Sequence, residues 1–168
     1  LPRPNILSVG AFVWYKHHEK VIDALSKMER GSLLIVGQGP LEQELKKRAK
    51  EKLDKRFMIS TFEYEDMPKV YRSCDVFTLP SWDREAFGIV YLEAMACGLA
   101  VIAPDDPPRR EIIGEAGIFT DVSDLEKYAQ DINNCLKRNW DNKPRQQAEK
   151  YSWEIISQKY EKVISNLR

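Results

Sequence analysis

Cysteine is scarce in this chain, and its spacing excludes two classes of protein. The three cysteines, Cys74, Cys97 and Cys135, are far apart and odd in number. This pattern argues against a disulfide framework and against a cysteine-ligated zinc site. Isolated cysteines in apolar surroundings usually pack as small core residues, so we interpret them in this way and expect a reducing, cytoplasmic location.

The chain also lacks net charge and long apolar runs. Lysine and arginine total 26, aspartate and glutamate total 26, and the formal net charge is zero. No long-range field therefore favours nucleic acid as a partner. No apolar stretch approaches the ~20 residues that a bilayer-spanning helix needs. The N-terminal "LPRPNILSVG" has no signal-peptide layout and enters a strand almost at once, so we expect a piece of a longer protein.

Short apolar runs alternate along the chain with segments of helical periodicity. Predicted strands cover residues 5–10, 32–38, 56–62, 75–81, 100–104 and 117–121. Predicted helices cover residues 18–28, 39–53, 66–74, 88–97, 109–113, 123–139 and 144–167. Ser123 is expected to cap its helix, with Glu126 completing a capping box.

This alternation predicts an α/β fold. Near-continuous apolar strands separated by helices are typical of a parallel sheet covered on both faces. About six units in 168 residues fit one domain, residues 1–168, with a Rossmann-like, open and doubly wound sheet. A closed eight-unit barrel typically needs ~250 residues. Ligands of open sheets bind beyond the carboxyl ends of the strands, so functional residues are expected in the strand-to-helix loops.

The segment "WDREAFGIVYLEAMACG", residues 82–98, carries the strongest functional signal. It delivers the chain through Gly88 into a helix, whose N-terminus exposes unpaired N–H groups and attracts phosphate. Glu85 precedes this helix, and Glu93 lies five residues into it, about 7.5 Å further along. Carboxylates accept hydrogen bonds from hydroxyl groups, so a sugar–diphosphate–nucleoside fits the order. Alternatively, Glu93 is a half-buried helix residue and Glu85 a surface loop residue.

The motif E-x-F-G-[IL]-x-x-x-E-A-M-A-x-G at residues 85–98 resembles that of the family 4 glycosyltransferases. These are retaining enzymes of GT-B fold, with two Rossmann-like halves facing across a cleft. Further matches follow in order along essentially the whole chain: "NILSVG…K", "LLIVGQGP", "MPKVYRSCDVFTLPS", "REIIGEAGIF" and "YSWEIISQKY". The resemblance implies that the chain is the C-terminal, nucleotide-sugar-binding half.

The resemblance also implies a role for each matching residue. Glu85 would contact hydroxyls of the donor sugar near the reacting carbon, and Glu93 would bind the ribose hydroxyls. Lys16 would neutralise the diphosphate. The remaining implied donor-site residues are Gly10, Phe62 beside the base, and the backbone of Ala86, Phe87, Gly88 and Ile89. No metal ion or other cofactor is implied.

The chain departs from the family pattern after the first strand. The usual arginine is replaced by Ala11. Arg84, Arg109 and Arg110 are candidates to supply the missing phosphate contact, although the last two sit in "PDDPPRREIIG" and could simply open a helix. His17 and His18 are expected at the surface or in packing. Trp14 and Tyr15 either line the cleft or the interface with the missing half, or pack in the core.

Three functions remain to be weighed. The first is the donor half of a retaining glycosyltransferase, inactive as an isolated fragment. Its last helix, 144–167, would pack against a missing N-terminal acceptor half, through which any membrane contact would also occur. The second is a non-catalytic nucleotide-binding or scaffolding domain that keeps the fold. The third, a dinucleotide-dependent oxidoreductase, is disfavoured because "VGQGP" lacks the third glycine of G-x-G-x-x-G.

Overall fold

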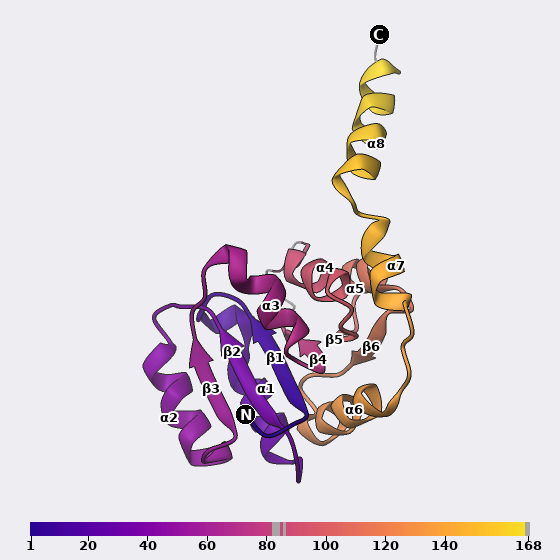
Figure 1. Cartoon of the computed structure of the whole chain (residues 1–168). Helices are drawn as coiled ribbons and strands as arrows, with labels where there is room; N and C mark the ends of the chain where they lie inside the picture. The colour runs from indigo at the N-terminus through magenta and orange to yellow at the C-terminus, as the bar shows by residue number, and fades with distance from the viewer. Residues whose placement is uncertain (82–84, 86, 167–168) are drawn as a thin grey trace.

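The computed structural model describes residues 1–81, 85 and 87–166, and it has three layers (Figure 1). A central sheet contains β1 Asn5–Val9, β2 Ser32–Val36, β3 Phe57–Ser60, β4 Val76–Thr78, β5 Val101–Pro104 and β6 Gly117–Thr120. The helices are α1 His18–Ser26, α2 Glu42–Leu53, α3 Met67–Arg72, α4 Ile89–Ala96, α5 Pro107–Ile113, α6 Leu125–Lys137, α7 Lys143–Glu149 and α8 Trp153–Ser165. Two short 3₁₀ helices, η1 Trp14–Lys16 and η2 Tyr64–Asp66, follow β1 and β3.

All strand pairs of the sheet are parallel, and the strand order is β3-β2-β1-β4-β5-β6. The order reverses between β1 and β4, where Ile6 pairs with Val76 and Leu7 with Phe77. The predicted doubly wound α/β fold of six strands is therefore confirmed. In such sheets the reversal point opens a crevice at the carboxyl ends of the strands.

Alternate residues of each strand supply two separate apolar cores, as the two-residue period of a strand requires. In β1, Ile6 packs in the core with α1, α2 and α6, whereas its neighbour Leu7 packs in the core with α3, α4 and α5. Both faces of the sheet are thus covered. Cys135 lies buried in the first core and Cys74 in the second, as predicted, while Cys97 is half-buried at the edge of the second.

The "VGQGP" turn after β2 holds the loop after β1 close to the sheet. A Cβ on Gly37 would lie 2.0 Å from the Gly10 carbonyl oxygen, so only glycine fits there. The Phe12 N–H donates to the Gln38 carbonyl at 2.9 Å, and the Leu41 N–H donates to the Phe12 carbonyl at 3.1 Å. Gly37 therefore allows the backbones of the two loops to pack closely against each other.

For two of the helices whose starts differ from the sequence prediction, the structure shows the local cause. Asp124, not Ser123, caps α6, because its carboxylate accepts the Lys127 N–H at 3.0 Å. The Ser123 N–H and hydroxyl both donate to Asp121 instead, which holds Ser123 in the preceding turn. The capping-box prediction was therefore wrong by one residue. The helix predicted from residue 39 begins at Glu42, after a turn in which the Glu42 N–H donates to the Gly39 carbonyl.

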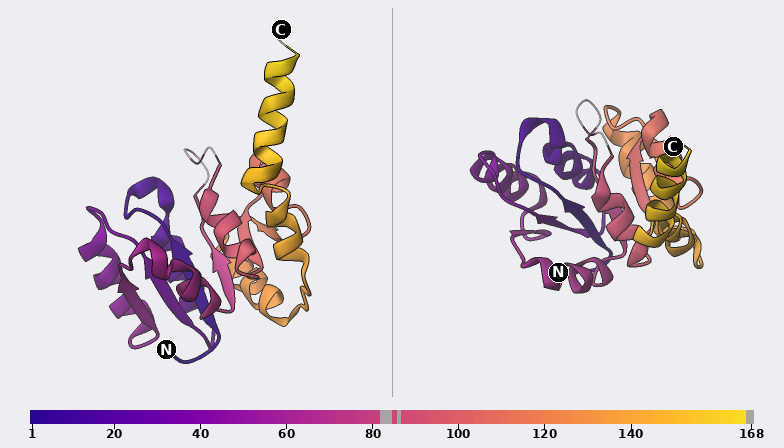
Figure 2. Two further views of the ribbon diagram at one scale, coloured as in Figure 1. Left: turned by 45° about the horizontal axis from the view of Figure 1, so that its top comes forward. Right: turned by 90° about the horizontal axis from the view of Figure 1, so that it is seen from above.

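The single helix predicted over residues 144–167 is two helices in the described part. α7 ends at Glu149, and a new N-cap at Ser152 starts α8. α7 packs against α4, whereas α8 has no buried residue and extends away from the rest of the molecule (Figures 1 and 2). Its exposed side chains include Trp153, Tyr160, Val163 and Ile164. Among the described residues, no helix is both long and apolar enough to cross a membrane.

Candidate functional site

Lys16 and Glu85 meet where the loops after β1 and β4 lie side by side. Lys16 is the last residue of η1, and its ammonium group forms an ion pair with the Glu85 carboxylate. Both side chains are mostly buried, with 16% and 13% of their surfaces exposed. Two residues that are 69 positions apart in sequence are therefore brought together at the point where the strand order reverses.

The start of α4 forms the next part of this site. Its N-cap is Gly88, whose φ of 73° lies in the left-handed region that favours glycine. A Cβ there would lie 2.7 Å from the Tyr91 ring and 3.4 Å from Glu85 Cγ. Gly88 makes no side-chain cap bond, and no acidic residue lies in the first turn of α4, which is fully described. This terminus can therefore bind an anion beside Lys16.

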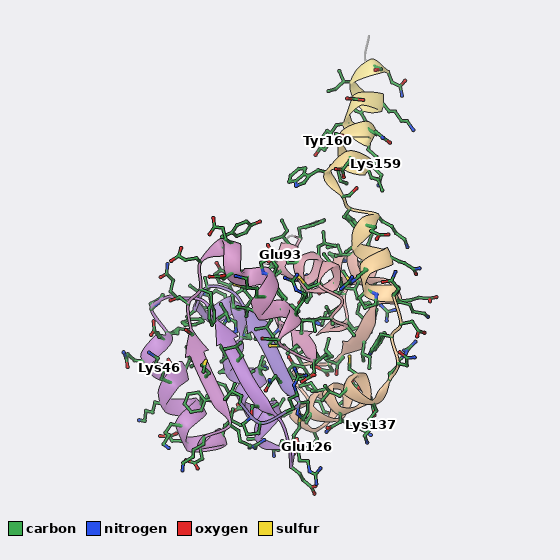
Figure 3. The ribbon with its side chains drawn as sticks, viewed as in Figure 1. Lys46, Glu93, Glu126, Lys137, Lys159 and Tyr160 are labelled. Atoms are coloured by element: carbon green, nitrogen blue, oxygen red, sulfur yellow. The ribbon has the colours of Figure 1, made fainter. Side chains whose placement is uncertain are left out.

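Glu93 lies further along α4 and is held by a tyrosine of the neighbouring helix. The Tyr71 hydroxyl donates to Glu93 Oε2 at 2.7 Å. Burial, together with the adjacent carboxylate, raises the pKa of Tyr71 above its ordinary value, so the phenol keeps its proton and remains a donor. Figure 3 shows Glu93 at the end of the molecule from which α8 projects, with Glu126 near the opposite end. Glu93 is thus a fixed hydrogen-bond acceptor.

The two arginines after β5 have different environments. Arg109 is buried, with its Nη2 donating to the Ser81 carbonyl at 2.8 Å and its Nη1 3.1 Å from Asp106 Oδ2. Asp106 also caps α5 by accepting the Arg109 N–H, and this turns the side chain inward. Arg110 is exposed and forms a two-pronged ion pair with Asp105 at 2.5 and 2.8 Å. The structure thus places Arg109 beneath the loop surface, and phosphate contact by either guanidinium stays a prediction.

His18 packs inside the molecule, as one of the two alternatives for it predicted. Its Nδ1 lies 3.0 Å from the Ser8 hydroxyl, and its ring meets Phe12 edge-on with centroids 5.5 Å apart. Burial lowers the pKa of His18 to about 4, so the ring is neutral near pH 7. His17 adopts a left-handed backbone at the start of α1, with its Nδ1 3.1 Å from Glu19.

The other predicted donor-site residues lie around this edge with different exposures. Gly10 directly follows β1 and lies beside Lys16, since a Cβ there would lie 3.6 Å from Lys16 Cδ. Phe62 follows β3 and is 42% exposed, and Ile89 in the first turn of α4 is 58% exposed. Ala86 and Arg84 lie outside the described residues. Within the described ranges, no group of three or more His, Cys, Asp or Glu side chains is arranged to hold a metal ion.

Two supporting residues were not predicted from the sequence. Tyr71 was interpreted only as part of a helix, and Ser81 as the end of a strand and part of the candidate loop 80–88, with no role of its own. Ser81 is fully buried, and its hydroxyl donates to the Tyr15 carbonyl at 2.9 Å. A serine directly after an apolar run and a tyrosine among the apolar residues of a short helix were the available signals, because polar groups at such positions need partners once they are buried.

A concavity of about 800 Å³ lies beside the site, between α4, α7 and α8. Glu93 lines it on one side, and Trp153 and Tyr160 of α8 line it on the other. Phe87 also contributes, and its ring packs edge-on to Tyr151 with centroids 6.0 Å apart. The wall opposite Glu93 is therefore largely aromatic.

Comparison with known proteins places this geometry in a family. A GDP-mannose-dependent monoacylated alpha-(1-6)-phosphatidylinositol monomannoside mannosyltransferase of Corynebacterium glutamicum is 30% identical over 151 residues, covering 80% of this chain and 39% of that enzyme. Anabaena HepE, solved with UDP and glucose, superposes with a TM-score of 0.82 at 22% identity, covering 98% of this chain and 49% of HepE. Sucrose-phosphate synthase of Thermosynechococcus elongatus superposes with a TM-score of 0.81 at 25% identity, covering 98% and 45%.

The family match extends over nearly the whole chain. The model of the glycosyl transferases group 1 family matches residues 2–154, from before β1 into the first turn of α8. That range contains Lys16, Glu85 and Glu93, and the six-stranded parallel sheet agrees with the GT-B fold of the structural neighbours. The chain therefore belongs to the group 1 glycosyl transferases, the family 4 glycosyltransferases of GT-B fold.

Proposed function

We propose that this chain is the donor half of a retaining glycosyltransferase and binds a nucleoside-diphosphate sugar at the carboxyl edge of its sheet. The observation that carries the proposal is the Lys16–Glu85 pair beside the uncapped N-terminus of α4, with Glu93 held further along the same helix. One cation, one helix terminus and two carboxylates match the charge and hydrogen-bonding order of such a donor.

In the proposed complex each group takes one part of the donor. The diphosphate lies between the Lys16 ammonium and the first N–H groups of α4, and the ribose hydroxyls donate to Glu93. Because the diphosphate competes for Lys16, Glu85 is released to accept hydrogen bonds from the sugar hydroxyls near the reacting carbon. As the glycosidic bond breaks, the departing diphosphate gains negative charge, which Lys16 and the helix terminus stabilise. No metal ion or other cofactor takes part in this proposal.

The names of the relatives support a nucleotide-sugar donor. The corynebacterial relative is named as GDP-mannose-dependent, and the HepE structure holds UDP and glucose. The likeness to HepE, at 22% identity, supports the fold. Retention of configuration is proposed from the family resemblance.

The acceptor half belongs to this proposal as a second domain. The chain spans 39% of the length of the corynebacterial relative and 49% of HepE. We propose that the exposed apolar side chains of α8 pack on that N-terminal half, which completes the cleft. The 168-residue chain alone then binds donor but transfers sugar poorly. Function in the cytoplasm, with any membrane contact through the N-terminal half, is part of the same proposal.

One observation favours a second candidate, a non-catalytic domain that binds nucleotide or acts as a scaffold. Ala11 stands where the family pattern has an arginine, and the two arginines after β5 are engaged by Asp105, Asp106 and Ser81. The positive charge available to a diphosphate is therefore smaller than in the family pattern. A scaffold would keep the fold while losing donor affinity.

A thermal-shift panel tests the proposed function. We expect the diphosphate sugars of one base, among uridine, guanosine and adenosine, to raise the melting temperature. At a ligand concentration of about 100 times Kd, binding adds about 2.7 kcal/mol to the free energy of unfolding, which corresponds to several degrees. The matching nucleoside without phosphate should give a much smaller shift. If no nucleotide sugar shifts the melting temperature at millimolar concentration, the scaffold function is favoured instead.

A further inference from the structure

A chain of buried hydrogen bonds connects α5 to the loop that carries Lys16. Arg109 donates from Nη2 to the Ser81 carbonyl at 2.8 Å. Ser81, in turn, donates from its hydroxyl to the carbonyl of Tyr15 at 2.9 Å. Tyr15 directly precedes Lys16, so the peptide unit that joins them is held by Ser81. Ser81 is fully buried and Arg109 is 2% exposed, so water competes little for these bonds.

The end of β4 is a junction for three elements. The Leu79 carbonyl accepts the hydroxyl of Tyr91, which belongs to the first turn of α4. Two residues later, the Ser81 carbonyl accepts a hydrogen bond from Arg109 of α5. The Ser81 hydroxyl donates to the carbonyl of Tyr15 in η1. The positions of η1 and of the start of α4 are therefore both set from one short segment, Leu79–Ser81.

Arg109 makes this segment costly to displace. A buried cation needs compensation by charge and hydrogen bonds, and Arg109 obtains it from Asp106 and from the Ser81 carbonyl. Its Nε has no hydrogen-bond partner among the described residues. A shift of Ser81 would leave the guanidinium further undercompensated, so Arg109 holds Ser81 in place.

The loop from Gly10 to His17 contains one lysine and no arginine. At its beginning, Phe12 forms backbone hydrogen bonds with the turn after β2. Near its far end, Tyr15 accepts a hydrogen bond from Ser81, which follows β4. Because Lys16 is the only full cation in this loop, the distance between its ammonium group and the α4 terminus decides how well both can contact one diphosphate.

We propose that Ser81 and Arg109 are positioning residues that hold Lys16 at the correct distance from the N-terminus of α4 for a diphosphate to bridge the two. The proposal rests on the proposed function, because the bridging ligand is the diphosphate of the donor. This role requires no contact of either residue with that ligand, because both act through the Tyr15–Lys16 backbone. This role is distinct from the direct phosphate contact predicted for Arg109 from the sequence.

Ser81→Ala and Thr78→Val form a matched pair to test this. Both remove one buried hydroxyl near the end of β4, but the Thr78 hydroxyl bonds the Ile102 carbonyl at 2.9 Å and Tyr128 at 2.6 Å, away from η1. Calorimetric titration with the nucleoside diphosphate of the preferred base is expected to show affinity about fivefold to tenfold lower for Ser81→Ala than for the unsubstituted chain. Affinity for the corresponding monophosphate should change much less, and Thr78→Val should bind both ligands unchanged.

Amide hydrogen exchange gives a second readout that needs no ligand. Ser81→Ala should exchange faster than Thr78→Val over residues 13–17, with equal exchange in β1. Equal diphosphate affinity in the unsubstituted chain and in Ser81→Ala would overturn the positioning role alone, as would equal exchange over residues 13–17 in the two variants. Failure of the unsubstituted chain to bind any nucleoside diphosphate would instead overturn the proposed function, whatever the exchange results.

Discussion

At the scale of single residues, the charged groups of the site are already satisfied by protein partners before any ligand arrives. Lys16 is paired with Glu85, and Glu93 accepts a hydrogen bond from Tyr71. A ligand that carries both an anion and hydroxyl groups can replace the Lys16–Glu85 ion pair, because its anion can bind Lys16 and its hydroxyl groups can donate to Glu85. Another of its hydroxyl groups can donate to Glu93 in addition to Tyr71. A simple inorganic anion can only separate Lys16 from Glu85 and leaves the carboxylate without a cation, which is unfavourable in a mostly buried position.

His18 provides a residue-scale prediction for stability against pH. Its pKa is about 4 in the folded chain, against 6.5 for an unperturbed histidine, because burial disfavours the charged ring. As pH falls from about 6.5 to about 4, the unfolded chain takes up a proton that the folded chain does not. His18 should therefore lower the free energy of unfolding progressively across this window, by about 3 kcal/mol in total.

Urea denaturation at a series of pH values measures this effect. His18→Gln keeps a side chain that can bond to Ser8 but does not titrate, so its stability should fall less steeply between pH 6.5 and 4.5. The comparison cancels the contribution of the carboxylates, which are common to both chains. Parallel stability curves for the two chains would contradict a neutral, buried His18.

At the scale of elements, the sequence predicted the core elements well and the polar connections poorly. Each of the six strands was predicted from its apolar run, because short, nearly continuous apolar runs are typical of strands buried on both faces of a sheet. The break at Ser152 was missed because residues on both sides of it favour a helix, and only the cap interaction with the Ile155 N–H interrupts the pattern. The predicted cap of α6 was one residue too early, because Ser123 and Asp124 are both good capping residues.

The candidate site shows the same division. Lys16 and Glu85 were assigned through the family resemblance, and the structure brings them together. Arg109 was interpreted either as a phosphate contact or as a residue that opens a helix, and it does lie in the first turn of α5, where the Asp106 cap turns its side chain inward. Ser81 and Tyr71 were overlooked because their partners lie 66 and 22 positions away, and local pattern reading cannot detect such pairs.

α8 gives the element-scale prediction. Because none of its described residues is buried, a chain ending at Ser152 should keep almost all of its stability, with a change in the free energy of unfolding below about 1 kcal/mol. Chemical denaturation of the two chains measures this. We also expect the shorter chain to self-associate less at high concentration, because Trp153, Tyr160 and Val163 are removed. A loss above about 3 kcal/mol would show that α8 belongs to the folded unit itself.

At the scale of the whole molecule, the fold and the family membership are mutually consistent. The family model covers residues 2–154, and α8 lies almost entirely beyond it. The part of the chain that the family model covers contains both buried cores, whereas α8, of which the model covers only the start, has exposed apolar side chains. This division supports the proposal that α8 serves the contact with another domain rather than the donor site.

The central claim is that a nucleoside diphosphate binds between Lys16 and the start of α4. The most direct measurement is calorimetric titration of the unsubstituted chain and of Lys16→Met with UDP, GDP and ADP and with the matching monophosphates. The account predicts one-to-one binding of one diphosphate, about tenfold or more weaker in Lys16→Met, because removing a charge-assisted contact costs about 1.5–3 kcal/mol. Monophosphate binding should weaken much less. Absence of binding by all three diphosphates at millimolar concentration, or equal affinity in the two chains, would contradict it.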